Sequence, residues 1–235
     1  MLAVSPSRPR KRLLAALSQA ELDLLRPHLE PVPLTIRMQL EPPNRPINHV
    51  YFPEIGIASV VAVQSKEAQV EVGLIGSEGM TGTSVVLGDD RSPHSTYMQV
   101  AGEGQRIPAS KVREAMKTSA SLHGMFLRSV QVFMVQTAHT AIANARAKVD
   151  ERLARWLLMA HDRVRDKRLP LTHEFLALML GVRRAGVTEA VNSLKKQKLI
   201  DTGRGEIIVL DRTGIERIAR KSYGTPEAEF KRLIG

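Results

Sequence analysis

The segment 172–200 carries the side chains whose types and spacing say most about chemistry. Along a helix predicted over about 183–197, apolar residues recur at spacings of four and three and should face inward. Long hydrogen-bond donors remain on the other sides. Arginine can bond guanine with two hydrogen bonds, asparagine can bond adenine, and lysine can neutralise a phosphate. The candidate DNA contacts on this helix are Arg183, Arg184, Thr188, Asn192 and Lys195.

A preceding helix and a following hairpin are expected to hold this helix in place. Thr172 is the expected N-cap of the preceding helix, and Gly181 permits the sharp turn between the two helices. Two short strands should follow, with Arg204 at the tip of their turn. Thr172, His173 and Arg204 therefore join the candidate DNA contacts. Helix, turn, helix and wing in this order predict a winged helix-turn-helix.

The net charge of +10 is concentrated at two places in the chain. Residues 1–12 carry four basic and no acidic side chains, and residues 13–149 carry twelve of each. Residues 150–235 carry eighteen basic and twelve acidic side chains. A basic C-terminal third beside a neutral segment indicates a polyanionic partner, and double-stranded DNA is the partner that we expect.

The N-terminal part has the pattern of a β domain. From Pro31 to about Ile107, short β-branched runs are separated by Pro, Gly and Asn, which predicts an all-β sandwich or barrel. A helix with a capping box at Ser18 and Glu21 should precede it, and another over Pro108–Lys117 should follow. The expected strands are LTIRMQL, HVYF, IASVVAV, AQVEVGLIG, STYMQVAG and GQRI.

A long helix is predicted over about 121–148, with residues repeating every seven positions as in a coiled-coil seam. The expected seam residues are Phe126, Val130, Phe133, Thr137 and Thr140. The opposite side is also apolar, with Leu127, Met134, Ala138 and Ala141. Such a helix needs two packing partners, and the β domain and a second copy of the helix would supply them. The pattern favours a homodimer, and a helix wholly inside one chain remains the alternative.

These elements divide the chain into four parts, with Asp150 as the expected N-cap of a new helix at the last boundary. The expected fold class is α+β, and the family resemblance given below implies that the N-terminal β-barrel or jelly roll is a sensor domain. The expected parts are a basic flexible tail (1–17), the sensor domain (18–120), the dimerisation helix (121–149) and the winged helix-turn-helix (150–235).

The chain resembles the Crp/Fnr family of bacterial transcription regulators over nearly its whole length. The resemblance is carried by ERLARWLL, LTHEFLALMLGVRRAGVTEAVNSL, LIDTGRGEIIVLD and, in the β domain, EVGLIGSEGMTGTSVVLGDDRSP. It implies a cyclic-nucleotide-binding-like barrel, a long dimer helix and a winged helix that binds a two-fold symmetric operator. RNA polymerase is a further partner that the resemblance implies for a regulator of transcription.

The sensor motif departs from the version that binds cyclic nucleotides. Those family members have a Gly-Glu pair whose carboxylate bonds the ribose, whereas Gly82 is followed here by Thr83. Thr83 is a poor substitute for a carboxylate that accepts with two oxygens, so cyclic AMP is not expected to be the effector. The glycines at 76, 79 and 82 either present backbone N–H groups to an anion or simply turn a tight corner. The candidate effector pocket comprises Gly79, Gly82, Thr83, Ser84, Arg91 and Ser92.

The recognition helix also departs from the family pattern. Arg184-Ala185-Gly186-Val187 stands where many members have Arg-Glu-Thr-Val, and Glu189 stands where a second basic residue is common. Arg184 can still contact guanine, but the operator sequence cannot be copied from the family.

Other function classes find little support in the sequence. Cysteine is absent, which excludes disulfides, thiolate metal sites and thiol nucleophiles. No two of the seven histidines have the spacing of metal ligands on a helix, and no nucleophile elbow or P-loop occurs, so we expect no enzyme, no metal and no cofactor. There is no apolar run long enough to span a membrane and no secretory signal, which favours a cytoplasmic protein.

Two alternatives stay open: a regulator gated by a different small anionic effector in the barrel pocket, and a sensor module that acts on a protein partner without DNA.

Overall fold

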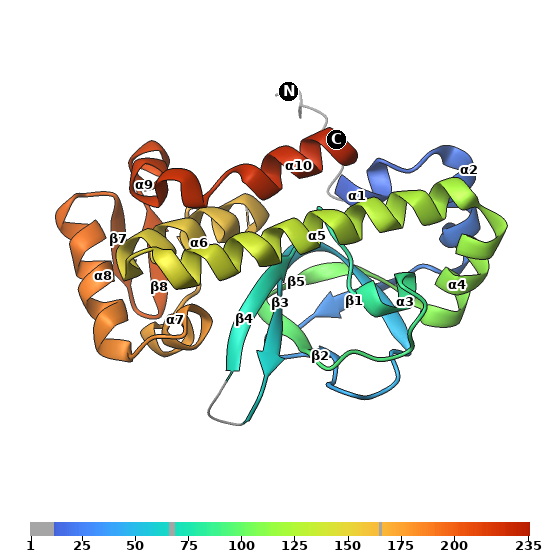
Figure 1. Cartoon of the computed structure of the whole chain (residues 1–235), viewed down its shortest axis with the longest axis horizontal. Coiled ribbons are helices and arrows are strands. Elements are labelled where there is room, and N and C mark those ends of the chain that lie inside the picture. The colour runs from blue at the N-terminus through green and yellow to red at the C-terminus, as the bar shows by residue number, and fades with distance from the viewer. Residues whose placement is uncertain (1–11, 66–68, 165) are drawn as a thin grey trace, which may run out of the picture.

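The computed structural model describes residues 12–65, 69–164 and 166–235 of the chain. Figure 1 shows an N-terminal sheet domain, a long helix lying along it, and a helical C-terminal domain at the far end of that helix. This order of parts agrees with the predicted α+β class. Most of the expected basic tail, residues 1–11, lies outside the described residues.

Two short helices begin the described chain, α1 (Arg12–Ala15) and α2 (Gln19–Leu25), followed by a 3-10 turn, η1 (Arg26–His28). Leu13 and Leu14 of α1 are buried, so residues 12–17 are not the exposed flexible segment that was predicted there. The capping box before α2 is confirmed: the Ser18 hydroxyl accepts from the backbone N–H of Glu21, whose carboxylate accepts from the N–H of Ser18.

The first five described strands form one antiparallel sheet, in the order β1-β5-β3-β4 with β2 beside β5. The predicted N-terminal sheet domain is confirmed, and the pairing of the described strands does not show a closed barrel. The strands are β1 (Glu30–Leu34), β2 (Gln39–Glu41), β3 (His49–Val63), β4 (Gln69–Ile75) and β5 (Ser95–Pro108), and a one-turn helix, α3 (Thr83–Val86), lies between β4 and β5.

Strands β3 and β5 are much longer than expected, because each joins two runs that were predicted as separate strands. Pro53 and Gly56, which look like turn residues in the sequence, lie instead within shifts of the β3–β5 register. Gly56 has a φ of 97°, and a Cβ there would lie 2.6 Å from the carbonyl oxygen of Val100. The glycine therefore permits a bulge that bends the strand without ending it.

Two helices follow the sheet, α4 (Ala109–Thr118) and the long α5 (Ala120–Arg146), whose bounds match the predictions to within two residues. The expected dimer seam on α5 is wrong in its first half. Phe126 and Val130 are buried inside the chain, and the ring of Phe126 lies 6.2 Å from that of Phe52 on β3. Phe133 is packed against the sheet beside Gly73. These side chains therefore pack within the chain, against the sheet and the N-terminal helices.

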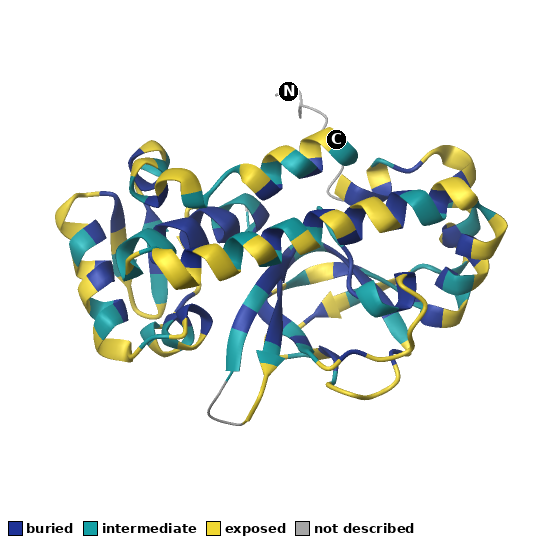
Figure 2. Cartoon of the chain, viewed as in Figure 1, coloured by how far each residue is buried: buried dark blue, intermediate teal, exposed yellow. Residues whose placement is uncertain are grey.

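The opposite side of α5 is the exposed one (Figure 2). Leu127 and Met134 are 41% and 58% exposed. The row continues with Gln131, Ala138, Ala141 and Ala145, so positions alternate by four and three along the helix. We call the set Leu127, Gln131, Met134, Ala138, Ala141 and Ala145 the outer row of α5.

The C-terminal domain begins with α6 (Val149–Val164), in which Asp150 lies within the first turn rather than at the N-cap. Three helices and three short strands follow it and close a common core around the buried Trp156 and Leu157. They are β6 (Arg168–Leu169), α7 (His173–Leu180), α8 (Arg184–Lys196), β7 (Ile200–Gly203), β8 (Glu206–Val209) and α9 (Arg212–Ala219), with a 3-10 turn η2 (Arg220–Ser222) after α9.

The two domains share one hydrophobic core. Ile57, Val61 and Leu74 of the sheet belong to the same buried cluster as α6, α7 and α8. A last helix, α10 (Thr225–Leu233), returns along α5 toward the N-terminal helices, as Figure 1 shows. The C-terminal domain is therefore docked on the sensor domain at both the sheet and the long helix.

Candidate nucleic-acid interface

The helix-turn-helix forms for local reasons that the sequence shows. The Thr172 hydroxyl accepts a hydrogen bond from the backbone N–H of Phe175 at 3.2 Å and caps α7. Gly181 ends α7 in the left-handed conformation with a φ of 59°. Arg183 is the N-cap of α8, so the second helix starts at Arg184. The predicted caps and turn are confirmed.

Helix α8 has one buried face and one exposed face. Val187, Val191 and Leu194 are at most 1% exposed and pack in the domain core. The exposed side carries long donors and one acid: Arg184, Glu189, Asn192, Lys195 and Lys196. This exposed side is what a reader of the major groove requires.

Polar contacts hold several of these donors in place. Arg184 pairs with Glu174 of α7 at 2.9 Å, and both side chains are about two-thirds exposed. Thr188 Oγ1 lies 3.1 Å from Nδ1 of His173, which ties the outer sides of α7 and α8 together. Exposed ion pairs are worth about 0–1 kcal/mol. A base or phosphate can therefore replace Glu174 as the partner of Arg184 at little cost.

The wing lies beside the C-terminal end of α8. Strands β7 and β8 pair around a turn in which Gly205 has a φ of 75°, and Arg204 is exposed at its tip. Lys195 reaches from α8 to the wing: its Nζ lies 2.8 Å from a carboxylate oxygen of Asp201 and donates to Thr202 Oγ1 at 3.1 Å. The predicted wing is confirmed.

The predicted contacts thus form two groups on one exposed surface. Around the start of α8 lie His173, Arg183, Arg184 and Thr188, and at its other end lie Lys195 and the wing. Asn192 is exposed between them. Thr172 is exposed, but its hydroxyl already caps α7, so its part in DNA contact would compete with that bond.

The candidate effector pocket does not come together as expected. Gly79 and Thr83 line a cavity of about 30 Å³ between the sheet and α5, whereas Gly82, Ser84, Arg91 and Ser92 do not line it. Pockets that hold small molecules measure roughly 300–1,000 Å³. Arg91 points elsewhere and pairs with Asp90 at 2.8 Å, with both side chains about half exposed.

The backbone N–H groups of the three glycines at 76, 79 and 82 already have acceptors within the chain. The N–H of Gly76 donates to Glu78 and that of Gly79 donates to the carbonyl of Gly76. The N–H of Gly82 donates to the carboxylate of Glu41, which is buried and also accepts from Thr96 Oγ1 at 2.6 Å. Burial raises the pKa of Glu41, and the two hydrogen bonds act in the opposite direction. The N–H groups of all three glycines therefore donate to the chain's own carboxylates and carbonyls rather than to an anion.

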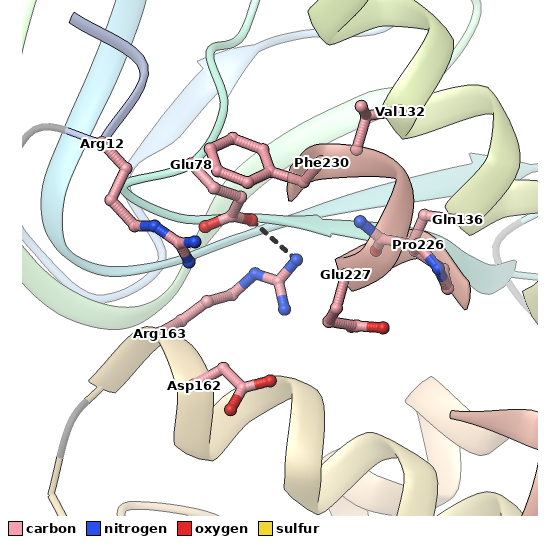
Figure 3. A pocket seen from close by; sticks show the side chains of 9 residues that line it. All are labelled: Arg12, Glu78, Val132, Gln136, Asp162, Arg163, Pro226, Glu227 and Phe230. Atoms are coloured by element: carbon pink, nitrogen blue, oxygen red, sulfur yellow. Dashed lines mark ion pairs between the residues drawn. The ribbon is translucent and has the colours of Figure 1, made fainter. Parts of the chain in front are cut away.

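Polar side chains, several of them buried, join the two domains, and sequence patterns did not predict these contacts. Figure 3 shows Arg163 of α6 directed at Glu78 of the sensor domain, with 2.6 Å between their charged atoms. Arg12 lies over the ring of Phe230 on α10 at 4.5 Å from its centre. Arg155, also buried, donates to the carbonyl oxygen of Ser222 and to Thr140 Oγ1. These contacts fix the orientation of the DNA-reading surface relative to the sensor.

The sheet contributes the most deeply buried of these groups. Glu71 on β4 accepts from the indole N–H of Trp156 at 2.7 Å and from Ser59 Oγ at 2.6 Å. Burial raises the pKa of Glu71 to about 7. Successive side chains of a strand point to opposite faces, so the sequence places Glu71 on one face of β4, but only the fold shows that α6 covers this face.

Residues 151–218 match the family described as the Crp-like helix-turn-helix domain. None of the curated protein sequences matches the chain. Among solved structures, a Crp/Fnr-family regulator from Eubacterium rectale shares 18% identity, covering 91% of this chain and 100% of that chain, with a TM-score of 0.69. FixK2 from Bradyrhizobium japonicum shares 12% identity over 82% of this chain and 98% of its own, with a TM-score of 0.68. The c-di-GMP responsive regulator CLP from Xanthomonas campestris shares 16% sequence identity, covering 82% of this chain and 99% of its own, with a TM-score of 0.64.

The C-terminal domain is thus a Crp-like helix-turn-helix domain, and the whole chain has the fold of Crp/Fnr transcription regulators. The resemblance inferred from the sequence is confirmed. These similarities support a DNA-binding regulator of transcription. Within the described residues, no helix is long and apolar enough to cross a membrane, and no cluster of three or more metal-binding side chains occurs.

Proposed function

We propose that this protein is a cytoplasmic transcription regulator that binds a two-fold symmetric DNA operator as a homodimer. The observation that carries the proposal is the exposed side of α8, with its arginines, Asn192 and Lys195, next to a wing with Arg204 at its tip. In this arrangement the start of α8 would contact base edges, and the end of α8 with the wing would contact phosphates. Contact with RNA polymerase is part of the same proposal.

Gel-shift titrations test the DNA-binding surface. Arg184→Ala should remove a two-bond contact to guanine and cost about 1–3 kcal/mol on the operator, with little effect on random DNA. Lys195→Ala should weaken operator and random DNA alike, because a lysine contributes through phosphate charge. If Arg184→Ala leaves operator binding unchanged, α8 does not dock as proposed.

The dimer would form along the outer row of α5. Apart from Gln131, that row is apolar or small; its positions alternate by four and three, and it remains exposed in the single chain. Met134→Asp should therefore yield monomers in sedimentation equilibrium and lose operator affinity. Ile36→Asp is the matched control, because Ile36 is equally exposed at 58% but lies between β1 and β2. A Met134→Asp chain that keeps the parent's mass would contradict the proposal.

The sensor domain is proposed not to respond to cyclic AMP, so that the chain without ligand already binds its operator. The 30 Å³ cavity and the occupied N–H groups of Gly76, Gly79 and Gly82 support this view, and they also weigh against a small anionic effector in the same pocket. Calorimetry with cyclic AMP and cyclic GMP should show no binding, and ligand-stripped protein should shift operator DNA. Micromolar binding of either nucleotide, or failure of the stripped protein to bind DNA, would refute it.

A further inference from the structure

Glu189 is an unpaired acid in the middle of the proposed DNA-reading surface. It lies two residues from both Val187 and Val191, which are buried, so it projects from the opposite side of α8. No ion pair or hydrogen bond joins its carboxylate to any side chain in the part of the chain that the structure describes. The residues three and four positions away are Ala185, Gly186, Asn192 and Ser193, none of which is basic.

The other acids of this region are compensated. Glu174 pairs with Arg184, Asp201 pairs with Lys195, and Glu206 pairs with Arg168 at 2.7 Å. Glu189 alone would bring an uncompensated negative charge toward the phosphates of a bound duplex. That charge opposes binding to every DNA sequence unless a base supplies a hydrogen-bond donor to it.

The major groove offers only two exocyclic amino donors, N4 of cytosine and N6 of adenine. The amino group of adenine stands beside N7, an acceptor whose lone pair repels a carboxylate. The amino group of cytosine stands beside the C5–H edge, which carries no lone pair. A glutamate therefore discriminates in favour of cytosine on charge alone.

The neighbours of Glu189 leave room for this contact. Ala185, one turn earlier, is exposed and small, and a Cβ added at Gly186 would meet nothing within 4 Å. The side chains in the first turn of α8 are thus short. The helix can therefore approach the base edges closely enough for the carboxylate of Glu189, in its second turn, to reach a base.

We propose that Glu189 is a specificity-determining residue that accepts a hydrogen bond from the N4 amino group of one cytosine in each half-site. The assignment rests on the proposed function, since it requires α8 to lie in the major groove. It adds a base preference that arginine and asparagine contacts do not supply.

Selection from a pool of random duplex DNA tests the assignment, using the full-length parent chain, Glu189→Ala and Glu189→Gln. The parent should enrich a motif with one cytosine that becomes degenerate in Glu189→Ala and shifts toward adenine in Glu189→Gln, because an amide both donates and accepts. Glu216→Ala is the control, since it removes one charge from α9 in the same domain and should leave the motif unchanged.

An operator with pyrimidin-2-one at that cytosine, which lacks the N4 amino group, provides a second measurement. The parent should lose roughly 5- to 150-fold in affinity, whereas Glu189→Ala should lose nothing further. Glu189→Ala should also bind random DNA more tightly than the parent does. If Glu189→Ala enriches the same motif as the parent, or if the parent's motif has adenine rather than cytosine at the affected position, the assignment is wrong but the proposed function still stands. A parent chain that enriches no sequence would overturn the proposed function and the assignment with it.

Discussion

The buried carboxylate of Glu71 should make the docking of the two domains depend on pH. Glu71 accepts hydrogen bonds only from neutral donors, Trp156 and Ser59, and desolvation raises its pKa to about 7 from an ordinary 4.5. The folded chain then holds a proton at this carboxyl more tightly than the unfolded chain does. The resulting stability is complete below about pH 4.5 and is lost as the pH rises to about 7. At about 1.36 kcal/mol per pH unit, the free energy of unfolding should fall by about 2 kcal/mol between about pH 5.5 and pH 8 from this group alone.

Glu71→Gln isolates the effect because it removes the charge and keeps the shape. The amide oxygen can still accept from Trp156, and the amide N–H can donate to Ser59, whose hydroxyl then acts as acceptor. Urea unfolding of the parent and of Glu71→Gln across this pH range should give curves that diverge toward high pH, with the variant the more stable. Glu216→Gln, at an exposed ion pair, should follow the parent.

Trp156 also reports on the carboxylate directly. It is the only tryptophan in the chain, and its indole N–H donates to Glu71. Its fluorescence should therefore titrate with a midpoint near pH 7 in the folded parent and not in Glu71→Gln. A midpoint below about 5.5, or parallel stability curves for the two chains, would refute the reasoning.

Two further predictions concern stability. Gly186→Ala should raise the free energy of unfolding by about 0.5–1 kcal/mol in thermal melts, because Gly186 is helical and a Cβ there meets nothing within 4 Å; a lower melting temperature would contradict this. Arg163→Met should cost about 3–5 kcal/mol by leaving Glu78 without its partner, and adding Glu78→Gln should restore much of the loss; equal costs for the single and double variants in urea unfolding would show that the ion pair is not the cause.

Features with a local cause were predictable from the sequence. The capping box at Ser18, the Thr172 cap, the left-handed Gly181 and the wing around Arg204 each depend on a few consecutive residues, and all are confirmed. The strands were predicted less well, since Pro53 and Gly56 look like turn residues but lie at bulges within one long strand. A bulge and a turn call for the same residue types, and only the pairing partner distinguishes them.

Features that depend on which face meets which partner were not predictable. Helix α5 is apolar on two sides, and periodicity alone could not show that Phe126 faces the sheet while Met134 faces outward. The charges on Glu71 and Arg163 are typical of exposed residues in a sequence, yet both are buried where the domains meet. Helix α10 likewise packs on α5, although the two helices lie far apart in the sequence. No local pattern indicates that contact.

Not all of the basic charge of the C-terminal third can contact DNA, because some of its arginines are buried. Arg155 and Arg163 count among its eighteen basic side chains, but both are buried, and Arg163 is neutralised by Glu78 of the other domain. On the proposed DNA-reading surface, the charge that can meet phosphate is that of α8 and the wing. The salt dependence of DNA affinity should therefore follow those positions rather than the net charge of the domain. Arg204→Ala should lower the slope of log affinity against log salt by about 1, whereas Arg163→Met combined with Glu78→Gln should leave it unchanged. If the double variant lowers the slope as much as Arg204→Ala does, Arg163 is exposed to DNA and the docked arrangement of the domains is not the one that binds it.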